Sequence, residues 1–408
     1  MKFDDYRISP EIKKNLLDLG FRRPTDIQYK AITPILKGDD VLAIAQTGTG
    51  KTAAFAIPVI DIIHQQKRVT QSEFISCLVM APTRELALQI TGVFKTICQH
   101  TLVKTACVFG GVDQEPQIST LKSGIDILVA TPGRLFDLVS QGHINLDRVQ
   151  ILVLDEADHM LALGFIKDIR QLIHRLPKYR QTLFFSATIN PEIKDLAYSL
   201  VTNPIRIEIS PKDPVAKNVT HSVAFISMDD KRFFLERVIK ENPDSKILVF
   251  VRTKVRAERV FKAMERIEIK CLTIHGDKEQ KDRLDVMSQF RKGEVKILIA
   301  TDVSARGIDI ADVDYVINYD LPDVAENYVH RVGRTGRGIK KGLAVSFCSP
   351  EEKPVLDEIE TFLDQKIKVV TIDKEDYSAT IDFSADNPHD WRALLKEESE
   401  MPLKKKKK

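Results

Sequence analysis

The chain has 408 residues, which is too long for one ordinary hydrophobic core and predicts two domains followed by a tail. Its content of 43% hydrophobic and 29% charged residues is typical of a globular protein and argues against general disorder. The net charge of +3 is too small to indicate nucleic-acid binding by itself, so any basic surface has to come from local placement.

Membrane-spanning and disulfide-bonded classes are disfavoured. No apolar run reaches about 18 residues, so no transmembrane helix is expected. The N-terminal sequence MKFDDYRISP lacks the apolar region of a secretory signal peptide. The five cysteines show no CxxC spacing, and several lie in apolar runs, which favours reduced core residues over disulfides or zinc ligands. These observations predict a cytoplasmic protein.

The first half of the chain alternates short apolar runs with amphipathic stretches: DVLAIAQ, SCLVMAP, TACVFGG, DILVATP, ILVLDEA and TLFFSAT. This alternation predicts βαβ units, and hence a mostly parallel sheet with helices on both faces. The pattern stops near Glu208, and residues 209–218, with prolines and mixed charges, are typical of a linker. Residues 1–208 are therefore predicted to form a first α/β domain.

The second half repeats this style with KILVFVRT, KCLTIHG, VKILIATD, VDYVINYD and GLAVSFC, which predicts a similar α/β domain over residues 219–370. Residues 371–408 are polar, lack strand signals and end in a run of lysines, which predicts a polar tail. The terminal PLKKKKK has no apolar positions, so we expect a short disordered basic tail there. Two interpretations of the lysines are equally supported. One is a sequence-independent RNA tether through phosphate contacts, and the other is a solubilising tail.

The segment AQTGTGKT, which begins at Ala45, follows a predicted strand and precedes a predicted helix. Gly48 and Gly50 allow the backbone N–H groups to point at phosphate oxygens, and the helix N-terminus adds positive potential. Lys51 could reach the β- and γ-phosphates, and Thr52 could bind Mg²⁺. Ala45 replaces the first glycine of the usual pattern. The alternative, a glycine-rich turn with an exposed lysine, is weaker in a strand–loop–helix setting.

The segment ILVLDEAD places three acids directly after a predicted buried strand. Phosphate-loop ATPases hold Mg²⁺ with an acid on a second strand of the sheet, and ligands bind at the carboxyl edge of such sheets. Asp155 would therefore contact Mg²⁺, and Glu156 would orient or deprotonate the attacking water. Without the phosphate loop upstream, a helix cap would be the better interpretation of Asp155.

The DEAD sequence (Asp155–Asp158), with AQTGTGKT before it and SAT after it, resembles the DEAD-box RNA helicases of superfamily 2. The resemblance covers roughly residues 3–370 and includes GFRRPTDIQ, PTRELA, TPGR, ATDVSARGIDI and HRVGRTGR in the family's order. It implies two RecA-like domains with ATP and RNA in the cleft between them. Residues 164–188 also resemble the bacterial RhlE-type branch of the family.

The resemblance assigns a set of nucleotide contacts. Gln28, in the segment that resembles the family's Q motif, would read the adenine edge, because its amide has both donors and acceptors. Phe21 would supply an aromatic face. The implied nucleotide-binding residues are Phe21, Gln28, Ala45, Gln46, Thr47, Gly48, Thr49, Gly50, Lys51, Thr52, Gly307 and Asp309.

The resemblance also assigns RNA contacts in both domains. Arginine side chains, hydroxyls and backbone amides at these positions could bind phosphates, although each taken singly would be a solvated loop residue. The implied RNA-binding residues are Arg84, Gly110, Gly111, Thr131, Pro132, Gly133, Arg134, Arg252, Thr253, His275, Gly276, Gln280, Arg283 and Thr301.

Two further motifs would link hydrolysis to unwinding. The hydroxyls of Ser186 and Thr188 could bond Asp158, with a plain turn as the alternative. Arg331 and Arg334, in a segment that resembles the family's arginine-finger motif, would stabilise charge on the γ-phosphate. The resemblance thus implies the catalytic residues Lys51, Asp155, Glu156, Arg331 and Arg334, the metal ligands Thr52 and Asp155, and the coupling residues Asp158, Ser186, Thr188 and His330.

The function that this resemblance implies is ATP-dependent local unwinding of short RNA duplexes or remodelling of RNA–protein complexes, with ATP and Mg²⁺ as cofactors. The RNA would be bound largely without regard to sequence, as a single strand or a short duplex. Ribosomal precursors or RNA-decay assemblies are the partners suggested for a chain that acts as a monomer. Two alternatives remain open, namely an ATP-gated RNA clamp or scaffold and a DNA helicase of the same superfamily. Sensitivity to the 2′-hydroxyl would separate RNA from DNA as the substrate.

Overall fold

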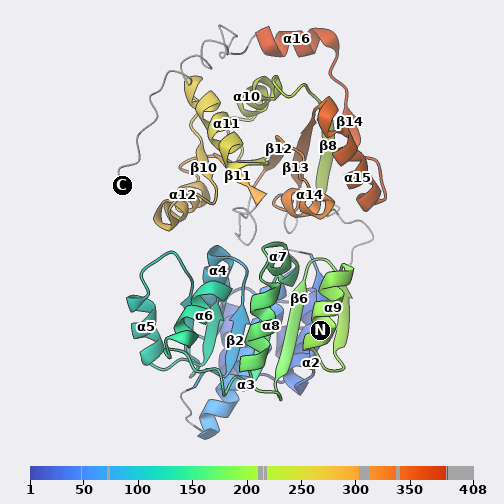
Figure 1. Ribbon diagram of the computed structural model, residues 1–408. Coiled ribbons are helices and arrows are strands. Elements are labelled where there is room, and N and C mark those ends of the chain that lie inside the picture. Colours follow the sequence, from blue (N-terminus) through green and yellow to red (C-terminus); the bar gives the residue numbers. More distant parts are fainter. Residues whose placement is uncertain are drawn as a thin grey trace.

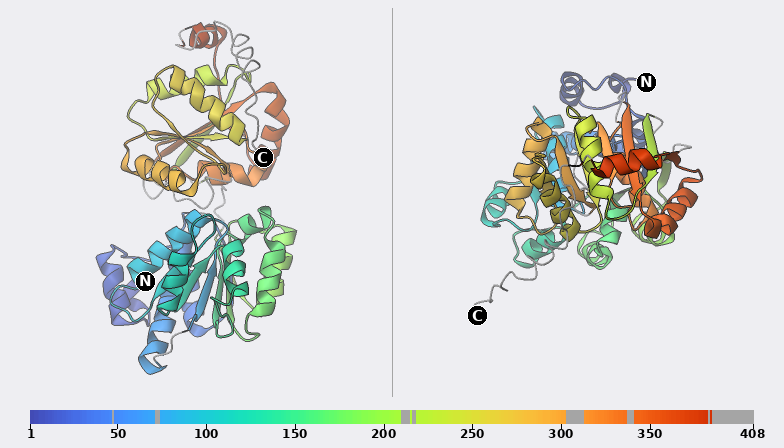
Figure 2. Two further views of the ribbon diagram at one scale, coloured as in Figure 1. Left: turned by 60° about the vertical axis from the view of Figure 1, so that its left-hand side comes forward. Right: turned by 90° about the horizontal axis from the view of Figure 1, so that it is seen from above.

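The chain forms two lobes, each built around a twisted sheet with helices on both of its faces (Figures 1 and 2). The structure is a computed structural model that describes residues 1–46, 48–70, 74–209, 215, 218–302, 313–336, 341–382 and 384. Within these residues no helix is both long enough and apolar enough to cross a membrane. The five cysteines are free thiols, as predicted, and three of them are buried.

The first domain is a seven-stranded sheet in the order β3-β4-β2-β5-β6-β1-β7, and all of its described strand pairs are parallel. Its strands are β1 (Val41–Ala45), β2 (Cys77–Met80), β3 (Thr105–Val108), β4 (Ile127–Ala130), β5 (Ile151–Leu154), β6 (Gln181–Ser186) and β7 (Ile205–Ile209). Its helices are η1 (Phe3–Asp5), α1 (Pro10–Asp18), α2 (Asp26–Lys37), α3 (Lys51–Thr70), α4 (Arg84–Ile97), α5 (Glu115–Lys122), α6 (Pro132–Ser140), α7 (Ala157–Ala162), α8 (Ile166–Arg175) and α9 (Pro191–Leu200).

The second domain is a seven-stranded parallel sheet in the order β10-β11-β9-β12-β13-β8-β14. Its strands are β8 (Val219–Phe225), β9 (Ile247–Val251), β10 (Leu272–Ile274), β11 (Ile297–Thr301), β12 (Tyr315–Asn318), β13 (Gly342–Cys348) and β14 (Lys368–Val370). Its helices are α10 (Lys231–Glu241), α11 (Lys254–Arg266), α12 (Gln280–Lys292), α14 (Ala325–Val332), η2 (Pro350–Glu352), α15 (Lys353–Leu363) and α16 (Lys374–Asp382).

The two sheets share one topology. When the strands of each domain are counted from that domain's own first strand, both sheets read 3-4-2-5-6-1-7. The prediction of two similar α/β domains with parallel sheets is therefore confirmed. Because the carboxyl ends of parallel strands meet at one edge, the loops that carry the predicted motifs are gathered at a corresponding edge of each sheet.

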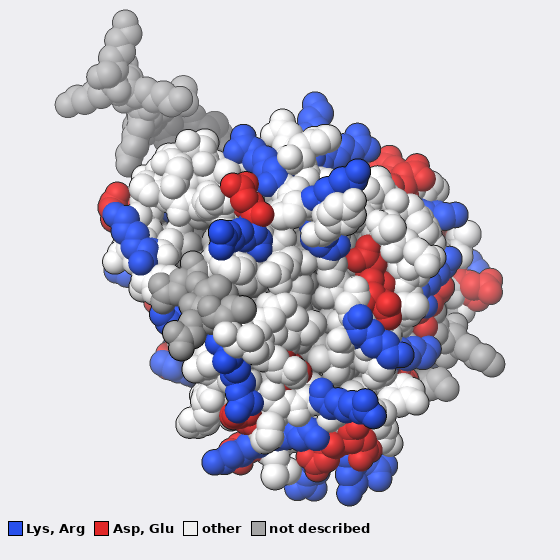
Figure 3. Space-filling view, turned by 90° about the horizontal axis from the view of Figure 1, so that it is seen from below, with Lys and Arg blue, Asp and Glu red and all other residues white. Residues whose placement is uncertain are grey.

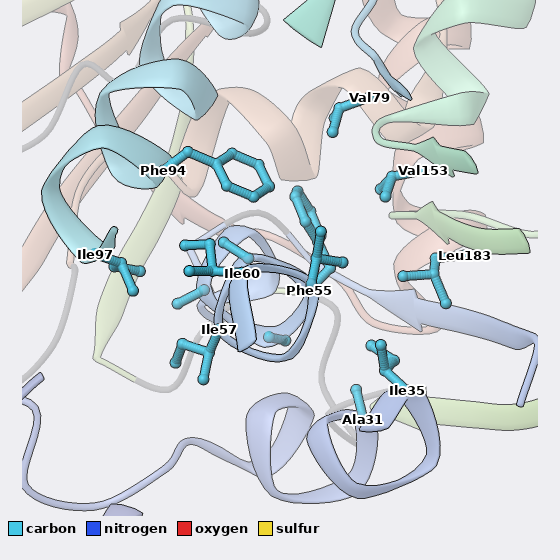
Figure 4. Packing of buried hydrophobic residues seen from close by; sticks show 14 of the residues in the cluster. Ala31, Ile35, Phe55, Ile57, Ile60, Val79, Phe94, Ile97, Val153 and Leu183 are labelled. Carbon is cyan, nitrogen blue, oxygen red and sulfur yellow. The ribbon is translucent and has the colours of Figure 1, made fainter. Parts of the chain in front are cut away.

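The core of the first domain fixes the helix that follows the phosphate loop. Figure 4 shows Phe55 of α3 packed among apolar side chains from α2, α4 and the sheet. Its ring centroid lies 5.2 Å from that of Phe185 on β6 and 6.1 Å from that of Phe94 on α4. Fully burying one such side chain contributes about 1.5 to 3 kcal/mol. This packing holds α3, and with it the phosphate loop, against the end of β1.

The predicted polar tail begins with a folded helix, α16, which packs on α10. The ring centroid of Tyr377 lies 4.9 Å from that of Phe234, and the Tyr377 hydroxyl donates to Asp230 Oδ2 at 2.8 Å. No helix is predicted from the sequence in this tail. The helix α16 forms because Tyr377 supplies an apolar contact that the polar composition of the segment conceals. Residues 385–408, with the lysine run, lie outside the described residues.

Candidate active site

The predicted segments of the first domain divide the carboxyl edge of its sheet into two halves. The predicted RNA contacts follow β2, β3 and β4, which are neighbours in the sheet. The phosphate loop, the DEAD acids and the SAT segment follow β1, β5 and β6, which are also neighbours. Strand order therefore separates a nucleotide side from an RNA side, although both sets alternate along the chain.

The phosphate loop has the backbone geometry that its glycines require. Gly48 and Gly50 have φ angles of 82° and 92°, a region that residues with a Cβ rarely adopt. Lys51 is the first residue of α3, is only 6% exposed, and donates from Nζ to the carbonyl of Ala45 at 2.8 Å. The ammonium group thus lies folded across the loop, next to the backbone N–H groups of the helix N-terminus, which is an arrangement that suits an anion.

The Q-motif residues lie directly against the phosphate loop. Gln28 accepts from the Thr25 N–H at 3.0 Å and donates to the Gly50 carbonyl at 3.2 Å, while the Thr25 hydroxyl donates to the Thr49 carbonyl at 2.8 Å. A Cβ at Gly50 would lie 2.5 Å from Gln28 Nε2, so only glycine allows this approach. The Gln28 amide keeps one donor and one acceptor for a ligand. Its contact with adenine stays a prediction.

Other predicted nucleotide contacts surround this loop. The Thr49 hydroxyl donates to the Gln46 carbonyl at 2.7 Å, which closes the loop on itself. Phe21 packs edge-on against Phe3, with the ring centroids 5.7 Å apart. Three predicted contacts, Thr47, Gly307 and Asp309, lie outside the described residues.

Asp155 is a deeply buried acid at the end of β5, with only 3% of its surface exposed. Burial raises its pKa to about 7, even though the charge of Lys51 acts in the opposite direction. A carboxylate in such a place is stabilised in its charged form by a cation. Among the described residues no three His, Cys, Asp or Glu side chains form a closed metal cage.

Glu156 follows with an unusual backbone, because its φ is 51° and it caps α7. Non-glycine residues in this region are strained, and such strain is concentrated at functional sites. Burial raises the pKa of Glu156, but the contact with His159 Nδ1 at 3.4 Å and the charges of Lys51 and Arg334 outweigh burial and lower the pKa to about 2. The carboxylate is therefore ionised.

The SAT segment contacts the last DEAD acid through one of its two hydroxyls. Thr188 donates to Asp158 Oδ2 from its hydroxyl at 3.1 Å and from its backbone N–H at 3.2 Å. Ser186 instead donates to the Thr188 carbonyl at 2.8 Å. The expected contact with Asp158 is thus present for Thr188 and absent for Ser186, whose side chain faces the turn itself.

Arg334 belongs to the second domain, but its positive charge acts on Glu156 of the first. It is 4% exposed, and its charge helps to lower the pKa of Glu156. This places the segment after α14 near the DEAD acids, and the contact of Arg334 with the γ-phosphate stays a prediction. His330, on α14, is partly buried.

Arg331 has a different place from the one predicted. It is 2% exposed and donates from Nε and Nη2 to the two carboxylate oxygens of Asp302, at 2.6 and 2.8 Å. Its Nη1 donates to the carbonyl of Asp320 at 2.6 Å, and its guanidinium lies over the ring of Phe250. The prediction that Arg331 faces the γ-phosphate is corrected, because its hydrogen bonds are made inside the second domain.

The predicted RNA contacts of the first domain form one group. Arg84 lies over the double glycine, since a Cβ at Gly111 would come within 2.0 Å of Arg84 Nη1. Arg134, on α6, donates from Nη2 to the carbonyl of Val112 at 2.8 Å, so its side chain contacts the same loop. Three further members, Thr131, Pro132 and Gly133, lie at the N-terminus of α6, and Gly110 precedes Gly111 after β3.

The predicted RNA contacts of the second domain follow β9, β10 and β11, which are adjacent in its sheet. His275 is 6% exposed, and its Nε2 lies 2.7 Å from Glu258 Oε1. This edge carries Arg252, Thr253, His275, Gly276 and Thr301. The side chain of Gln280, which begins α12, is outside the described set.

Arg283 of α12 forms an ion pair across the two domains. Its Nη2 lies 2.9 Å from Glu85 Oε1, and both side chains are largely buried. Glu85 follows Arg84 at the start of α4, so the pair lies beside the first-domain RNA group. Figure 1 shows the same relationship, with α12 above α4. Sequence reasoning missed Glu85, which carries no signal of its own beyond being next to Arg84.

The lower end of the molecule has no continuous basic band among its described residues. Figure 3, which views this end from below, shows Lys and Arg interspersed with Asp and Glu. This agrees with the net charge of +3.

Comparison with known proteins supports the family resemblance. The DEAD/DEAH box helicase family matches residues 25–196, and the helicase conserved C-terminal domain matches residues 230–338. The chain is 42% identical to the ATP-dependent RNA helicase RhlB of Shewanella frigidimarina (strain NCIMB 400) over 92% of this chain and 87% of the relative. The chain belongs to the DEAD-box helicase family. Relatives from other Shewanella species also bear the name RhlB, so the RhlE-type branch is not confirmed for this helicase.

The two domains of the helicase are placed as in a ligand-bound relative. Yeast Dbp5 (S. cerevisiae) bound to RNA and ADP BeF3 is 28% identical, covers 93% of this chain and 98% of its own, and has a TM-score of 0.81. A DEAD box protein from Methanococcus jannaschii is 37% identical and covers 91% and 99%, but its TM-score is 0.53. In overall arrangement the chain is thus more similar to the yeast protein bound to RNA and ADP BeF3 than to the Methanococcus protein, although its sequence is less similar.

Proposed function

We propose that this helicase binds ATP and RNA between its two domains, hydrolyses ATP to ADP and phosphate, and uses the cycle to unwind short RNA duplexes. The observation that carries this proposal is the action of Arg334, from the second domain, on Glu156 of the first. The phosphate loop and the acids belong to one domain and this arginine to the other. The hydrolytic site is complete only when the domains are closed.

The first domain supplies the nucleotide contacts. The N–H groups of the phosphate loop and the ammonium group of Lys51 would bind the phosphates, and Gln28 would couple adenine recognition to the loop through its bond to Gly50. Thr52 and Asp155 would hold Mg²⁺, which neutralises charge on the β- and γ-phosphates. The buried Asp155 carboxylate, with hard oxygen donors, suits this ion.

Hydrolysis would depend on Glu156 and Arg334. A general base is most effective when its pKa lies near the working pH. Because the pKa of Glu156 is lowered to about 2, we assign to it the orientation of the attacking water in preference to strong proton abstraction. Arg334 would stabilise the charge that develops on the transferred phosphoryl group. Asp158 and Thr188 would transmit the state of this site through their two hydrogen bonds.

RNA would lie across the two groups of strand-end residues. Arg84 and Arg134 contribute cations on the first domain, and Arg252 contributes one on the second. Since both domains contribute to both ligands, ATP and RNA each favour the closed arrangement, so binding of one strengthens binding of the other. A closed state that bends one strand would expel the partner strand, which gives local unwinding without long-range translocation.

The cellular setting is part of the proposal. Free cysteines suit a reducing compartment such as the cytoplasm. Contacts to phosphate and sugar suit RNA of any sequence, including ribosomal precursors or RNA-decay assemblies. We propose a monomer, since both halves of the site lie on one chain. The RhlE-type branch stays a prediction.

Unwinding of a short RNA duplex tests the proposal. We expect strand separation that requires ATP and is lost in Glu156→Gln, while this variant still binds RNA in the presence of ATP. If Glu156→Gln retained full strand-separating activity, the role assigned to Glu156 would be wrong. A wild-type chain that holds RNA in the presence of ATP but separates no strands would favour the ATP-gated clamp. Efficient unwinding of a DNA duplex of the same sequence would favour the DNA-helicase alternative.

A further inference from the structure

A cluster of buried charged residues in the second domain belongs to none of the sets assigned above. Its members Lys231, Asp320 and Glu352 are 0%, 2% and 3% exposed. Burying a charged side chain is costly unless it is paired and hydrogen-bonded. The arrangement of partners around this cluster therefore shows which parts of the domain it holds together.

Glu352 uses all of its acceptor capacity to join four segments. Its Oε1 accepts from the Leu321 N–H and from Arg252 Nη2, both at 3.1 Å. Its Oε2 accepts from the Ser349 N–H at 3.1 Å and from Lys231 Nζ at 2.5 Å. A carboxylate offers about four such positions. The segments after β9, β12 and β13 and the start of α10 thus meet at this one side chain.

Asp320 fixes the same region from a second direction. Its Oδ2 accepts from the Arg252 N–H at 3.0 Å, and its Oδ1 lies 2.9 Å from Arg256 Nε. Its carbonyl accepts from Arg331, which in turn pairs with Asp302. The backbone of Arg252 is therefore held by Asp320 and its side chain by Glu352, and both are linked to the motif that follows β11.

These contacts occupy one edge of the Arg252 guanidinium. Nε lies 2.9 Å from Asp323 Oδ1, and Nη2 donates to Glu352 and to the Leu321 carbonyl. Nη1 makes no hydrogen bond to any described residue, so it is available for a phosphate oxygen. Asp323 is 68% exposed and Glu352 is 3% exposed, so the buried carboxylate is the stronger constraint. An arginine held in this way loses less freedom when it binds a ligand.

We propose that Glu352 is a positioning residue for RNA binding, which orients Arg252 toward the RNA backbone with Lys231 as its buried counter-charge. The proposal rests on the RNA contact proposed for Arg252. It assigns a functional consequence to residues that lie outside every motif identified in the sequence.

A mutant cycle with a matched control tests this role. The variants are Glu352→Gln, Arg252→Ala, their double mutant, and Glu351→Gln, which changes the exposed neighbouring glutamate. RNA-stimulated ATPase is measured over a range of single-stranded RNA concentrations at fixed salt, with thermal unfolding recorded in parallel. We expect Glu352→Gln to raise the KM for RNA about tenfold, the loss of roughly one charge-assisted hydrogen bond. The KM for ATP and kcat at saturating RNA should stay within about twofold, a change too small to indicate a lost contact.

The double mutant decides whether Glu352 acts through Arg252. If it does, the double mutant binds RNA no more weakly than Arg252→Ala alone. Additive losses, or an equal effect of Glu351→Gln, would overturn the positioning role. If Arg252→Ala binds RNA normally, the RNA contact itself is wrong, and that failure is separate from failure of the ATPase assignment, which Glu156→Gln reports.

Arg252→Lys provides a test that keeps the three buried members of the cluster, Lys231, Asp320 and Glu352, unchanged. Lysine keeps the charge but lacks the planar guanidinium whose edge Glu352 holds. We expect this variant to bind RNA within about twofold of Arg252→Ala, because orientation in addition to charge is required. Full retention of RNA affinity by Arg252→Lys would contradict the proposal, even if Glu352→Gln failed to fold.

Discussion

Arg331 donates hydrogen bonds from Nε and Nη2 to the two carboxylate oxygens of Asp302, and from Nη1 to the backbone carbonyl of Asp320. This fork joins the segment after β11 to α14, the helix that precedes Arg334. The resemblance would place Arg331 on a phosphate. Its contacts instead stabilise the part of the second domain on which Arg334 lies.

Loss of Arg331 should therefore lower the stability of the second domain toward unfolding. Removing one partner of a buried ion pair typically costs about 3 to 5 kcal/mol, because the remaining charge is left uncompensated. We expect Arg331→Ala to lower the midpoint of thermal unfolding, measured by calorimetry, as well as activity. If the variant kept the unfolding midpoint of the wild type and lost only kcat, a contact between Arg331 and the phosphate would be supported instead.

Arg334→Ala should show the opposite behaviour. Its charge acts on Glu156 from across the domains, so its loss should reduce turnover and leave the fold intact. We expect kcat for RNA-stimulated ATP hydrolysis to fall by about 10³-fold, as for other arginine fingers. Nucleotide binding, followed with a fluorescent ATP analogue, should change little. An unaltered kcat would show that Arg334 does not take part in hydrolysis.

Lys51→Ala and Glu156→Gln should separate binding from hydrolysis. Lys51 lies in the phosphate loop, so its loss should weaken ATP binding by about tenfold or more, because a charge-assisted contact to phosphate disappears. Glu156→Gln should bind ATP normally and lose hydrolysis. Equilibrium nucleotide binding and single-turnover hydrolysis distinguish the two, and wild-type rates in either variant would refute the assignment.

The ion pair between Glu85 and Arg283 should favour the closed arrangement of the domains. We expect Glu85→Arg to reduce RNA-stimulated ATPase and the double variant with Arg283→Glu to recover part of it, because the pair is reversed but present. Reversal of the exposed pair Arg206–Glu208 serves as the control. If Arg283→Ala and Glu85→Ala have additive effects, Arg283 contacts RNA independently of Glu85.

Truncation should locate the end of the second domain. A chain that ends at Ser384 keeps α16, whereas a chain that ends at Val370 loses the contact of Tyr377 with Phe234. We expect only the shorter chain to unfold at a lower temperature, by about 5 °C, because it loses a partly buried aromatic pair and its hydrogen bonds. Equal unfolding midpoints would show that α16 contributes nothing.

Much of the fold and of the candidate site is predictable from the sequence, because the motifs follow apolar strands in a fixed order. The parallel sheets, the phosphate loop and the acids after β5 follow from local patterns such as ILVLDEAD. The prediction for Arg331 is wrong because a motif does not say which of its arginines faces inward; that depends on how α14 packs against the sheet beside β12. Glu352 and Glu85 were missed because their partners, Arg252 and Arg283, are distant in the sequence. The helix α16 was missed because a polar composition concealed one aromatic anchor.

The steady-state ATPase rate tests the central claim most directly. It would be measured without nucleic acid, with single-stranded RNA, and with DNA of the same sequence, at fixed salt and with Glu156→Gln as the blank. A site completed across two domains, with RNA contacts on both, predicts strong stimulation by RNA and little by DNA. Equal stimulation by DNA would contradict RNA as the substrate, and a rate that no nucleic acid changes would contradict the coupling between the domains.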